Sequence, residues 1–379
     1  MRCRSTSLVL QLSTLFLLVG LTRAFYGLTA RETYLTLNPN YQERMSDIKK
    51  ITHEDYCNSL GLHRKQKRVC RKGKGVAEML VRATRLAALE CQHQFQQERW
   101  NCSLGSYRKN LLEKGFKETA FLFAISSAGL VHEVSRSCAQ GILDRCTCDE
   151  TEHLENRETW LWGGCGDNIK FGLKFTRKFL RRFSNNDKDI RAKVDDHNTE
   201  AGIKTVKDLV NTTCKCHGVS GSCTVKTCWL RLSPFKTVGN VLKAKYERSA
   251  KVIHVTNQAT GVALLKKQLQ SFPEEAAVLP VPSKQSHLGD NIANDTAPLR
   301  KSDLTYIEDS PSFCRETRYS PGTVGRSCIK GENCDSICCG RGHNVQKKKF
   351  KRACRCEVIW CCVVKCKECP DEQELYLCK

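Results

Sequence analysis

The spacing of its 25 cysteines constrains this 379-residue chain more than any other feature. They are moderately spaced between Cys57 and Cys228, none occurs between Cys228 and Cys314, and twelve fall in the last 66 residues. A segment so rich in cysteine has little room for an apolar core and depends on disulfides, each of which stabilises by about 2–4 kcal/mol. These three regimes predict a first domain, a linker and a small second domain.

The N-terminus predicts secretion. Arg2 and Arg4 precede an apolar run at residues 8–21, and residues 22–24 offer a cleavage point, which is typical of a signal peptide over residues 1–24. The run is too short to span a membrane, which takes about 20 apolar residues. Removing the peptide leaves an even number of cysteines, which in an exported chain indicates disulfides rather than metal ligands.

Residues 25–251 are predicted to form a helical N-terminal domain, because apolar residues recur at helical spacing in several segments. In one of them, phenylalanine recurs every fourth residue from Phe171 to Phe183. This spacing predicts an aromatic stripe that faces the core and a basic face that meets solvent. The predicted helices are residues 76–90, 118–135, 169–183 and 187–210.

The rest of the chain divides into a linker and a cystine-rich domain. Prolines and polar residues predict a flexible, exposed linker over residues 252–301. In residues 302–379, β-prone residues between close cysteines predict disulfide-tied hairpins, so the whole fold is α+β and disulfide-rich. The apolar residues of the segment 354–366 have no core to enter, so we expect an exposed tip that a partner covers. Packing against neighbouring strands is the alternative.

The chain is strongly basic, with a formal net charge of +22, or +19 without the three arginines of the signal peptide. The basic residues cluster at residues 64–68, 177–182 and 347–352. Sulfated glycans are the abundant polyanions outside the cell, so the clusters predict glycan binding, and secretion argues against nucleic acid. A general contribution of the charge to solubility is the alternative.

Three sequons of the type N-x-[ST] predict N-linked glycans at Asn101, Asn211 and Asn294. Asn294, in the predicted linker, is the easiest of them to reach. Asn101 precedes Cys102, a cysteine that we expect to form a disulfide, so its access is more restricted.

The segment CKCHGVSGSC, residues 214–223, forms a short loop that cysteines hold firmly. With Cys228, its three cysteines could pair as Cys214–Cys228 and Cys216–Cys223, which would nest one ring inside another. Other pairings also close small rings, so the sequence alone does not choose between them. Either way, the tip of the loop is held out with little side-chain bulk.

The tip of this loop carries two hydroxyls, those of Ser220 and Ser222, and a rigid exposed serine favours modification by an enzyme. His217 lies beside them, but a serine nucleophile also needs an orienting acid and an oxyanion pocket, which a small surface loop does not supply. The motifs GxSxG, HExxH and GxxxxGK[ST] are absent from the sequence, so we do not expect an enzyme.

Motifs spread along the chain resemble those of one protein family. They are ECQHQF at residues 90–95, RWNC at 99–102, AISSAG at 124–129, WGGCGDN at 162–168, DSPSFC at 309–314 and CCGRGHN at 338–344. Together with CKCHGVSGSC they resemble the Wnt family of secreted, lipid-modified morphogens over essentially the whole mature chain. FYGLT at residues 25–29 and GFKETA at 115–120 are most similar to the ninth Wnt subclass.

The resemblance implies a hand-like fold. The helical N-terminal domain would extend a long disulfide-braced hairpin, the thumb, with residues 214–228 as its lipidated loop. The small cystine-rich domain would extend a β-hairpin, the index finger. Ser220 matches the acylated serine of the family, which implies a palmitoleoyl ester that the acyltransferase Porcupine adds and a product that the transporter Wntless exports.

Thumb and finger would together grip the cysteine-rich domain of a Frizzled receptor. The implied receptor contacts are Gly218, Val219 and Gly221 in the thumb and Val358, Ile359, Trp360, Cys361, Cys362, Val363 and Val364 in the finger. The other implied partners are a low-density-lipoprotein-receptor-related co-receptor and heparan sulfate proteoglycans, and the outcome is Wnt signalling through either branch, dependent on β-catenin or not. Apart from the ester and the N-glycans, no cofactor or metal is implied. The alternative is a heparan-sulfate-binding extracellular matrix protein without receptor agonism.

The resemblance also implies disulfides. It pairs Cys91 with Cys102, Cys138 with Cys146, Cys148 with Cys165, and Cys361 with Cys362. Besides the four thumb cysteines, it places in disulfides Cys314, Cys339, Cys328, Cys334, Cys338, Cys378, Cys354, Cys369, Cys356 and Cys366. The partners of Cys57 and Cys70 stay open.

Overall fold

The computed structural model describes most of the chain beyond residue 56. The described residues are 57–58, 60, 62–149, 160–163, 165–181, 190–256, 263–268, 296–297, 300–359 and 363–379. The predicted signal peptide, the sequon at Asn294 and the predicted tip residues Trp360, Cys361 and Cys362 lie outside them.

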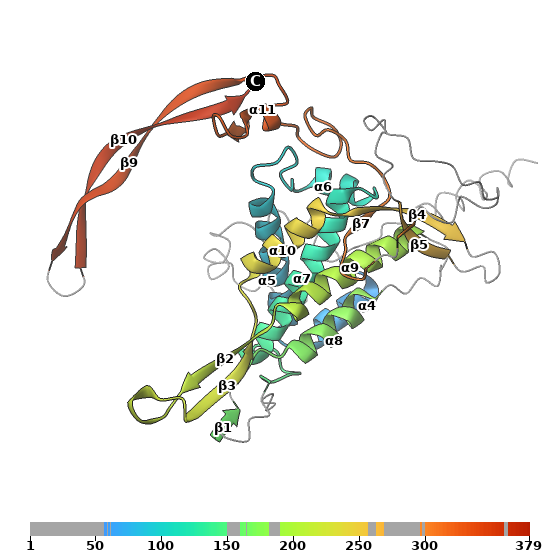
Figure 1. Cartoon of the computed structure of the whole chain (residues 1–379), viewed down its shortest axis with the longest axis vertical. Helices are drawn as coiled ribbons and strands as arrows, with labels where there is room; N and C mark the ends of the chain where they lie inside the picture. Colours follow the sequence, from blue (N-terminus) through green and yellow to red (C-terminus); the bar gives the residue numbers. More distant parts are fainter. Residues whose placement is uncertain are drawn as a thin grey trace, which may run out of the picture.

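The N-terminal half is a bundle of helices around α7, Lys117–Ala139 (Figure 1). This helix is buried along nearly its whole length and on every face, its polar residues included, which is typical of a helix that others surround. The helices around it are α4 (Arg64–Lys72), α5 (Val76–Gln94), α6 (Ser106–Leu112), α8 (Ile169–Leu180), α9 (Ile190–Asp208) and α10 (Phe235–Glu247). The prediction of a helical N-terminal part is confirmed.

Helix α8 shows why the aromatic spacing matters. It begins after Asn168, whose side-chain oxygen accepts a hydrogen bond from the Phe171 amide at 2.9 Å, an ordinary N-cap. Its buried Phe179 and the partly buried Phe171 and Phe175 pack into one of the two apolar clusters of the bundle. The helix ends at Leu180, three residues before the predicted end.

Glycine allows α7 and α9 to approach closely. A Cβ on Gly202 of α9 would lie 2.1 Å from the Ala124 carbonyl oxygen of α7 and 2.4 Å from the Ser127 hydroxyl. Neither distance is compatible with van der Waals contact, so any side chain there must push the two helices apart. The contact between these helices therefore requires glycine at this position.

We expect Gly202→Ala to destabilise the fold by about 1–3 kcal/mol, the usual cost of overpacking a close-packed interior. For a chain of this size, that loss lowers the Tm by about 1–4 °C. Thermal unfolding of the secreted protein measures it. Lys207→Ala adds alanine to an exposed position of the same helix and is the control. Equal Tm values for the two variants would contradict the close approach.

The thumb is an antiparallel hairpin of β2 (Asn211–Cys216) and β3 (Val225–Arg231), which leaves the bundle after α9 (Figure 1). Strand β1 (Trp160–Gly163) adds a parallel neighbour to β3. The register places Cys214 opposite Cys228, so a disulfide can join the two strands directly. The hairpin returns to the bundle through α10.

The predicted linker contributes to a second sheet, in the order β6-β5-β4-β7. Its strands are β4 (Ala250–Thr256), β5 (Ala263–Gln268), β6 (Thr296–Ala297) and β7 (Thr305–Tyr306). Strand β4 pairs in parallel with β7 beyond the linker, so the two ends of the segment 252–301 lie beside each other. Residues 257–262, 269–295 and 298–299 lie outside the described residues, and the domain boundaries stay a prediction.

The C-terminal part is built on one long hairpin, the finger, of β9 (His343–Ile359) and β10 (Val363–Cys378). At its root lie the short strand β8 (Ser327–Cys328), which pairs with the end of β10, and helix α11 (Cys334–Ile337). Figure 1 shows the finger extending from the body on the same side as the thumb. The prediction of a cystine-rich hairpin domain is confirmed.

In the described part of the chain, no helix combines the length and the apolar character that a bilayer crossing requires.

Candidate functional site

Two disulfides brace the thumb. Cys214 is joined to Cys228 across the hairpin, and Cys216 is joined to Cys223 nearer its tip. Of the arrangements that the sequence leaves open, the structure therefore has the nested one. Each ring excludes large movements of the loop inside it, so the tip is held at a fixed place on the end of the hairpin.

The tip itself is a single short turn, η3, Val219–Gly221. Ser220 has φ 56° and ψ 27°, and Gly221 has φ 78°, so the chain turns through two successive left-handed residues. A Cβ on Gly218 would lie 2.0 Å from the Ser222 hydroxyl, so only glycine fits there. A left-handed serine is uncommon and persists where the surroundings hold it, here two disulfides.

The two hydroxyls of the tip differ in their surroundings. The Ser222 hydroxyl lies 3.1 Å from the Thr224 hydroxyl and forms a hydrogen bond with it. Ser220 is exposed, and no described residue forms a hydrogen bond with its hydroxyl. Its neighbour Val219 is also exposed, at 90 %. Of the two exposed hydroxyls, that of Ser220 is therefore the one without a hydrogen bond to a described residue, and it is presented beside an apolar side chain.

His217 does not complete a Ser–His pair in this structure. Its Nε2 lies 2.9 Å from the Thr227 hydroxyl, and its amide donates to the Val225 carbonyl at 2.7 Å. Both partners of His217 belong to β3, so its ring is bonded to the hairpin and not to the serines of the tip. The loop thus presents a serine without assembling a nucleophile from it, which fits a modified residue better than a catalytic one.

The root of the thumb borders a cavity of about 610 Å³ between the hairpin and the bundle. Buried His132 lines it and hydrogen-bonds the Ser233 carbonyl through Nε2 at 3.1 Å. Burial lowers the pKa of His132, so the neutral ring is the donor. Asp167 fixes the end of β3 by accepting from the Leu232 amide at 2.8 Å. These contacts set the direction in which the thumb leaves the body.

The two described sequons differ in accessibility. The side-chain amide of Asn211 donates to the Ser233 hydroxyl at 3.0 Å, and the residue is exposed at the start of β2. Asn101 is partly buried, and its side-chain oxygen accepts a hydrogen bond from the Ser103 hydroxyl at 2.6 Å. Occupancy of both sites stays a prediction.

The end of the finger is apolar on both faces. Val358 stands opposite Val364 and Ile359 opposite Val363, and opposed pairs in a hairpin alternate between its two faces. All four are exposed, with Val358 at 74 % and Val364 at 57 %. We call these four residues the finger tip. The alternative interpretation, in which these residues pack on neighbouring strands, does not agree with their exposure.

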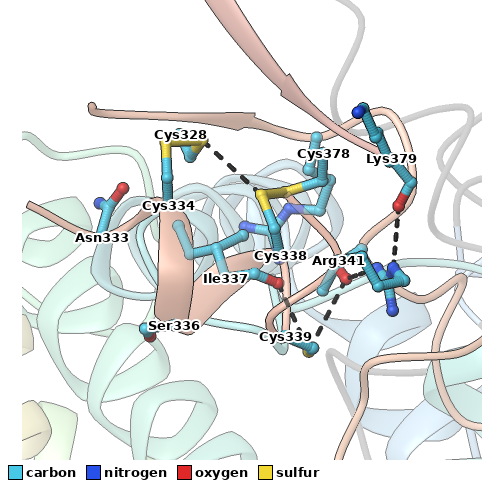
Figure 2. Close-up of a disulfide and its surroundings, with 12 residues drawn as sticks. Cys328, Asn333, Cys334, Ser336, Ile337, Cys338, Cys339, Arg341, Cys378 and Lys379 are labelled. Carbon is cyan, nitrogen blue, oxygen red and sulfur yellow. Dashed lines mark hydrogen bonds between the residues drawn. A yellow bond between two sulfur atoms is a disulfide. The ribbon is translucent and has the colours of Figure 1, made fainter. Parts of the chain in front are cut away.

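Disulfides hold the finger along its length. Cys356 is joined to Cys366 and Cys354 to Cys369 behind the tip. At the root, the disulfides Cys328–Cys334 and Cys338–Cys378 touch, with 3.7 Å between Cys338 Sγ and Cys328 Sγ (Figure 2). The remaining disulfides among the described cysteines are Cys57–Cys70, Cys91–Cys102, Cys138–Cys146, Cys148–Cys165 and Cys314–Cys339.

At the root of the finger, several sulfur atoms lie as close together as the ligands of a metal ion would. Sulfur atoms of Cys328, Cys338 and Cys378 lie within 4.8 Å of one another, and Cys328 and Cys334 lie as close to His343. All four cysteines are in disulfides, and a disulfide offers no thiolate to a metal. The cluster therefore braces the hairpin.

The three basic clusters are not equivalent. Helix α4 carries six basic residues and no acidic one, and the side-chain amide of Gln66 donates to the Phe179 carbonyl of α8 at 3.1 Å. The clusters at 64–68 and on α8 thus lie side by side (Figure 1). We call this surface the α4–α8 face.

On β9, by contrast, carboxylates of β10 oppose the basic cluster. Glu374 stands opposite Lys347 and Glu372 opposite Lys349. Lys351 lies 3.0 Å from Glu368, and Arg352 lies 3.1 Å from Asp371. The positive charge of this strand is therefore largely balanced within the finger.

Comparisons with known proteins agree with this geometry. The wnt family matches residues 58–379. The chain is 52% identical to Protein Wnt-9a of Gallus gallus over 357 residues and 47% identical to Protein Wnt-9b of Homo sapiens over 356 residues, covering 94% of each chain in both cases. One chain of the solved structure "Human WLS in complex with WNT8A" superposes with a TM-score of 0.55 at 30% identity, over 80% of this chain and 94% of that one.

The match spans the helical body, the thumb and the finger, and the identities fit the ninth subclass that the FYGLT and GFKETA motifs indicate. This chain belongs to the Wnt family.

Proposed function

We propose that this Wnt family signalling ligand binds the cysteine-rich domain of a Frizzled receptor through two contacts, an acyl chain on Ser220 and the apolar finger tip. The observation that carries the proposal is the tip of the thumb. There the Ser220 hydroxyl is exposed on a turn that two disulfides fix, and no described residue forms a hydrogen bond with it. The finger tip supplies a second exposed apolar surface.

The acyl chain is a palmitoleoyl group, and an acyltransferase of the Porcupine type attaches it during secretion. Ser220 lies in an exposed turn and is followed directly by Gly221, which supports this step, because no side chain on that side keeps the enzyme from the hydroxyl. The Ser222 hydroxyl is a poorer acceptor, since its hydrogen bond to Thr224 must break first. The modified residue is therefore Ser220 rather than Ser222.

Peptide mapping of the secreted protein by mass spectrometry tests the proposal. The peptide that contains the thumb loop should carry a palmitoleoyl mass, and fragmentation should assign it to Ser220. A bare Ser220 hydroxyl in active protein would overturn the mechanism. The same digest reports the glycans at Asn101 and Asn211.

The acylated protein needs a carrier on its way out of the cell. A single acyl chain holds a protein at a membrane only reversibly, yet leaves it with poor solubility in water. The similar WNT8A chain was solved in complex with human WLS. This supports export of the present chain by a transporter of the same kind, with the lipid shielded from water.

A second binding function rests on the α4–α8 face. Exposed Arg64 and Arg68 lie on one side of α4, and the exposed Lys178 lies near the end of the adjacent α8. We propose that heparan sulfate chains bind this face, because α4 is basic and carries no carboxylate, although Glu200 of α9 pairs with Arg177 of α8. The cluster on β9 contributes less, since β10 balances it.

Two variants that lose the same charge separate these surfaces. The triple variant Arg64→Ala, Arg68→Ala, Lys178→Ala should elute from a heparin column at a clearly lower salt concentration than the unmodified protein. Its matched control is Lys347→Ala, Lys349→Ala, Lys351→Ala. We expect the shift of the first to be roughly twice that of the second, because local potential governs polyanion binding more than net charge does. Equal shifts would contradict the proposed location.

A further inference from the structure

Arg326 connects the root of the finger to the N-terminal domain. Its guanidinium donates three hydrogen bonds to main-chain carbonyl groups of one loop, residues 96–99. The acceptors are the carbonyl oxygens of Glu98 at 2.5 Å, Arg99 at 2.7 Å and Gln96 at 3.0 Å. The buried disulfide Cys91–Cys102 closes this loop, so the acceptors are held in a fixed arrangement.

On its other side, Arg326 is part of the finger. It directly precedes β8, which pairs with the last residues of β10, and its own carbonyl accepts from the Cys378 amide at 2.9 Å. Cys378 is in turn joined to Cys338 at the root (Figure 2). Any change in the direction of the finger must therefore move Arg326 relative to the loop 96–99.

Two further contacts connect the same loop and the same root. The Arg99 guanidinium donates to the Ser336 carbonyl at 2.8 Å, and the side-chain amide of Asn333 donates to the Gln97 side-chain oxygen at 2.6 Å. Arg326 makes more of these hydrogen bonds than either, and they need a planar group with several donors in a fixed fork. A lysine ammonium is a single point and cannot reach three separate carbonyl oxygens in the same way.

We propose that Arg326 is a positioning residue, which fixes the finger relative to the thumb and so sets the spacing of the two receptor contacts. The inference rests on the proposed function, in which acyl chain and finger tip bind one receptor domain. Two linked contacts bind more tightly than either alone only while their spacing suits the partner, because the link sets the effective concentration of the second contact. Loosening the link removes that gain and leaves each contact intact.

The first test needs no receptor. Dyes are attached through unnatural amino acids at two exposed positions, Thr224 in the thumb and Gln373 in the finger, and single-molecule energy transfer reports the spread of distances. Arg326→Ala should broaden the distribution, and Arg326→Lys should broaden it less. Arg315→Ala, at an exposed arginine of the same domain, should leave it unchanged. An unchanged distribution for Arg326→Ala would overturn the proposal, whatever the receptor does.

The second test is a double-mutant cycle on binding to the Frizzled cysteine-rich domain. Arg326→Ala alone should weaken binding about tenfold or more, since linkage of two sites commonly contributes 10²–10⁴ in affinity. In a protein whose finger tip is already inactivated by Val364→Asp, the same change should have almost no effect, because no second contact remains to be positioned. A loss of equal size in both backgrounds would overturn the positioning role and indicate general destabilisation.

The two tests keep failure of the inference apart from failure of the proposed function. A broadened distance distribution together with unchanged receptor affinity in both backgrounds would overturn the positioning role for binding. Failure of the proposed function shows instead as full receptor affinity in a Ser220→Ala protein, which is measured independently of Arg326.

Discussion

Replacement of Ser220 by alanine is expected to lower the affinity for a Frizzled cysteine-rich domain by at least about 100-fold. Burial of an acyl chain contributes about 0.8 kcal/mol per methylene, so a chain with more than ten of them offers roughly 10 kcal/mol before the costs of association. A 100-fold loss corresponds to only about 2.7 kcal/mol. Even if most of the gross gain is offset, the remaining loss is therefore large.

The matched control is Ser222→Ala, which removes a hydroxyl from the same turn. Ser222 is bonded to Thr224, and its loss should leave acylation at Ser220 and receptor affinity within about threefold, as for an exposed neutral hydrogen bond. Biolayer interferometry on secreted protein in detergent measures both variants, and disulfide mapping of the thumb checks the fold. If Ser222→Ala lowers affinity as much as Ser220→Ala, the assignment to Ser220 is wrong.

The sequence predicts the thumb loop but not its chemistry in detail. The cysteines around residues 218–222 indicate a stapled turn from their spacing alone. The distinction between Ser220 and Ser222 depends on where the Thr224 hydroxyl lies, which follows from the left-handed turn at Ser220 and Gly221. Turn geometry of this kind cannot be predicted from composition. From the sequence, only the resemblance to a family selects Ser220 over Ser222.

Predictions from periodicity succeed where an element packs mainly by its own pattern. The helices α5 and α7 form where the sequence predicts them, because burial of one apolar face decides α5 and burial on nearly every side decides α7. The strands β4 and β5 were not predicted from the sequence, which indicates a flexible linker over residues 252–301. Strand β4 is stabilised by its parallel partner β7, which lies some 50 residues further along the chain, and prolines between them suggest a linker instead.

The basic clusters and the hydrogen bonds of Arg326 show a second limit of prediction from the sequence. The sequence presents residues 347–352 as a positive run, and only the register with β10 brings Glu372 and Glu374 opposite it. Arg326 is a single arginine whose partners are main-chain carbonyl groups. Because every residue has such a carbonyl, no pattern of side chains points to the contact.

The finger tip should be the second large determinant of receptor binding. We expect the pair Val358→Asp and Val364→Asp to weaken binding to the cysteine-rich domain about 100-fold. Full burial of one valine contributes about 1.5–3 kcal/mol, and a carboxylate placed in an apolar contact adds a desolvation cost. These two residues stand opposite each other on one face of the hairpin, so the pair removes that face as a unit.

Exposure makes this pair a clean test, because charges at solvent-facing positions disturb the folded state little. Val345→Asp is the control: Val345 is 52 % exposed on the same strand β9, but it lies at the root, opposite Tyr376. Binding of this variant should stay within about threefold of the unmodified protein, as for a surface change away from the contact. The pair Val358→Ser and Val364→Ser separates lost burial from added charge and should weaken binding by an intermediate factor. If the aspartate pair binds as well as Val345→Asp, the receptor does not cover the finger tip, and the acyl chain on the thumb is the main attachment.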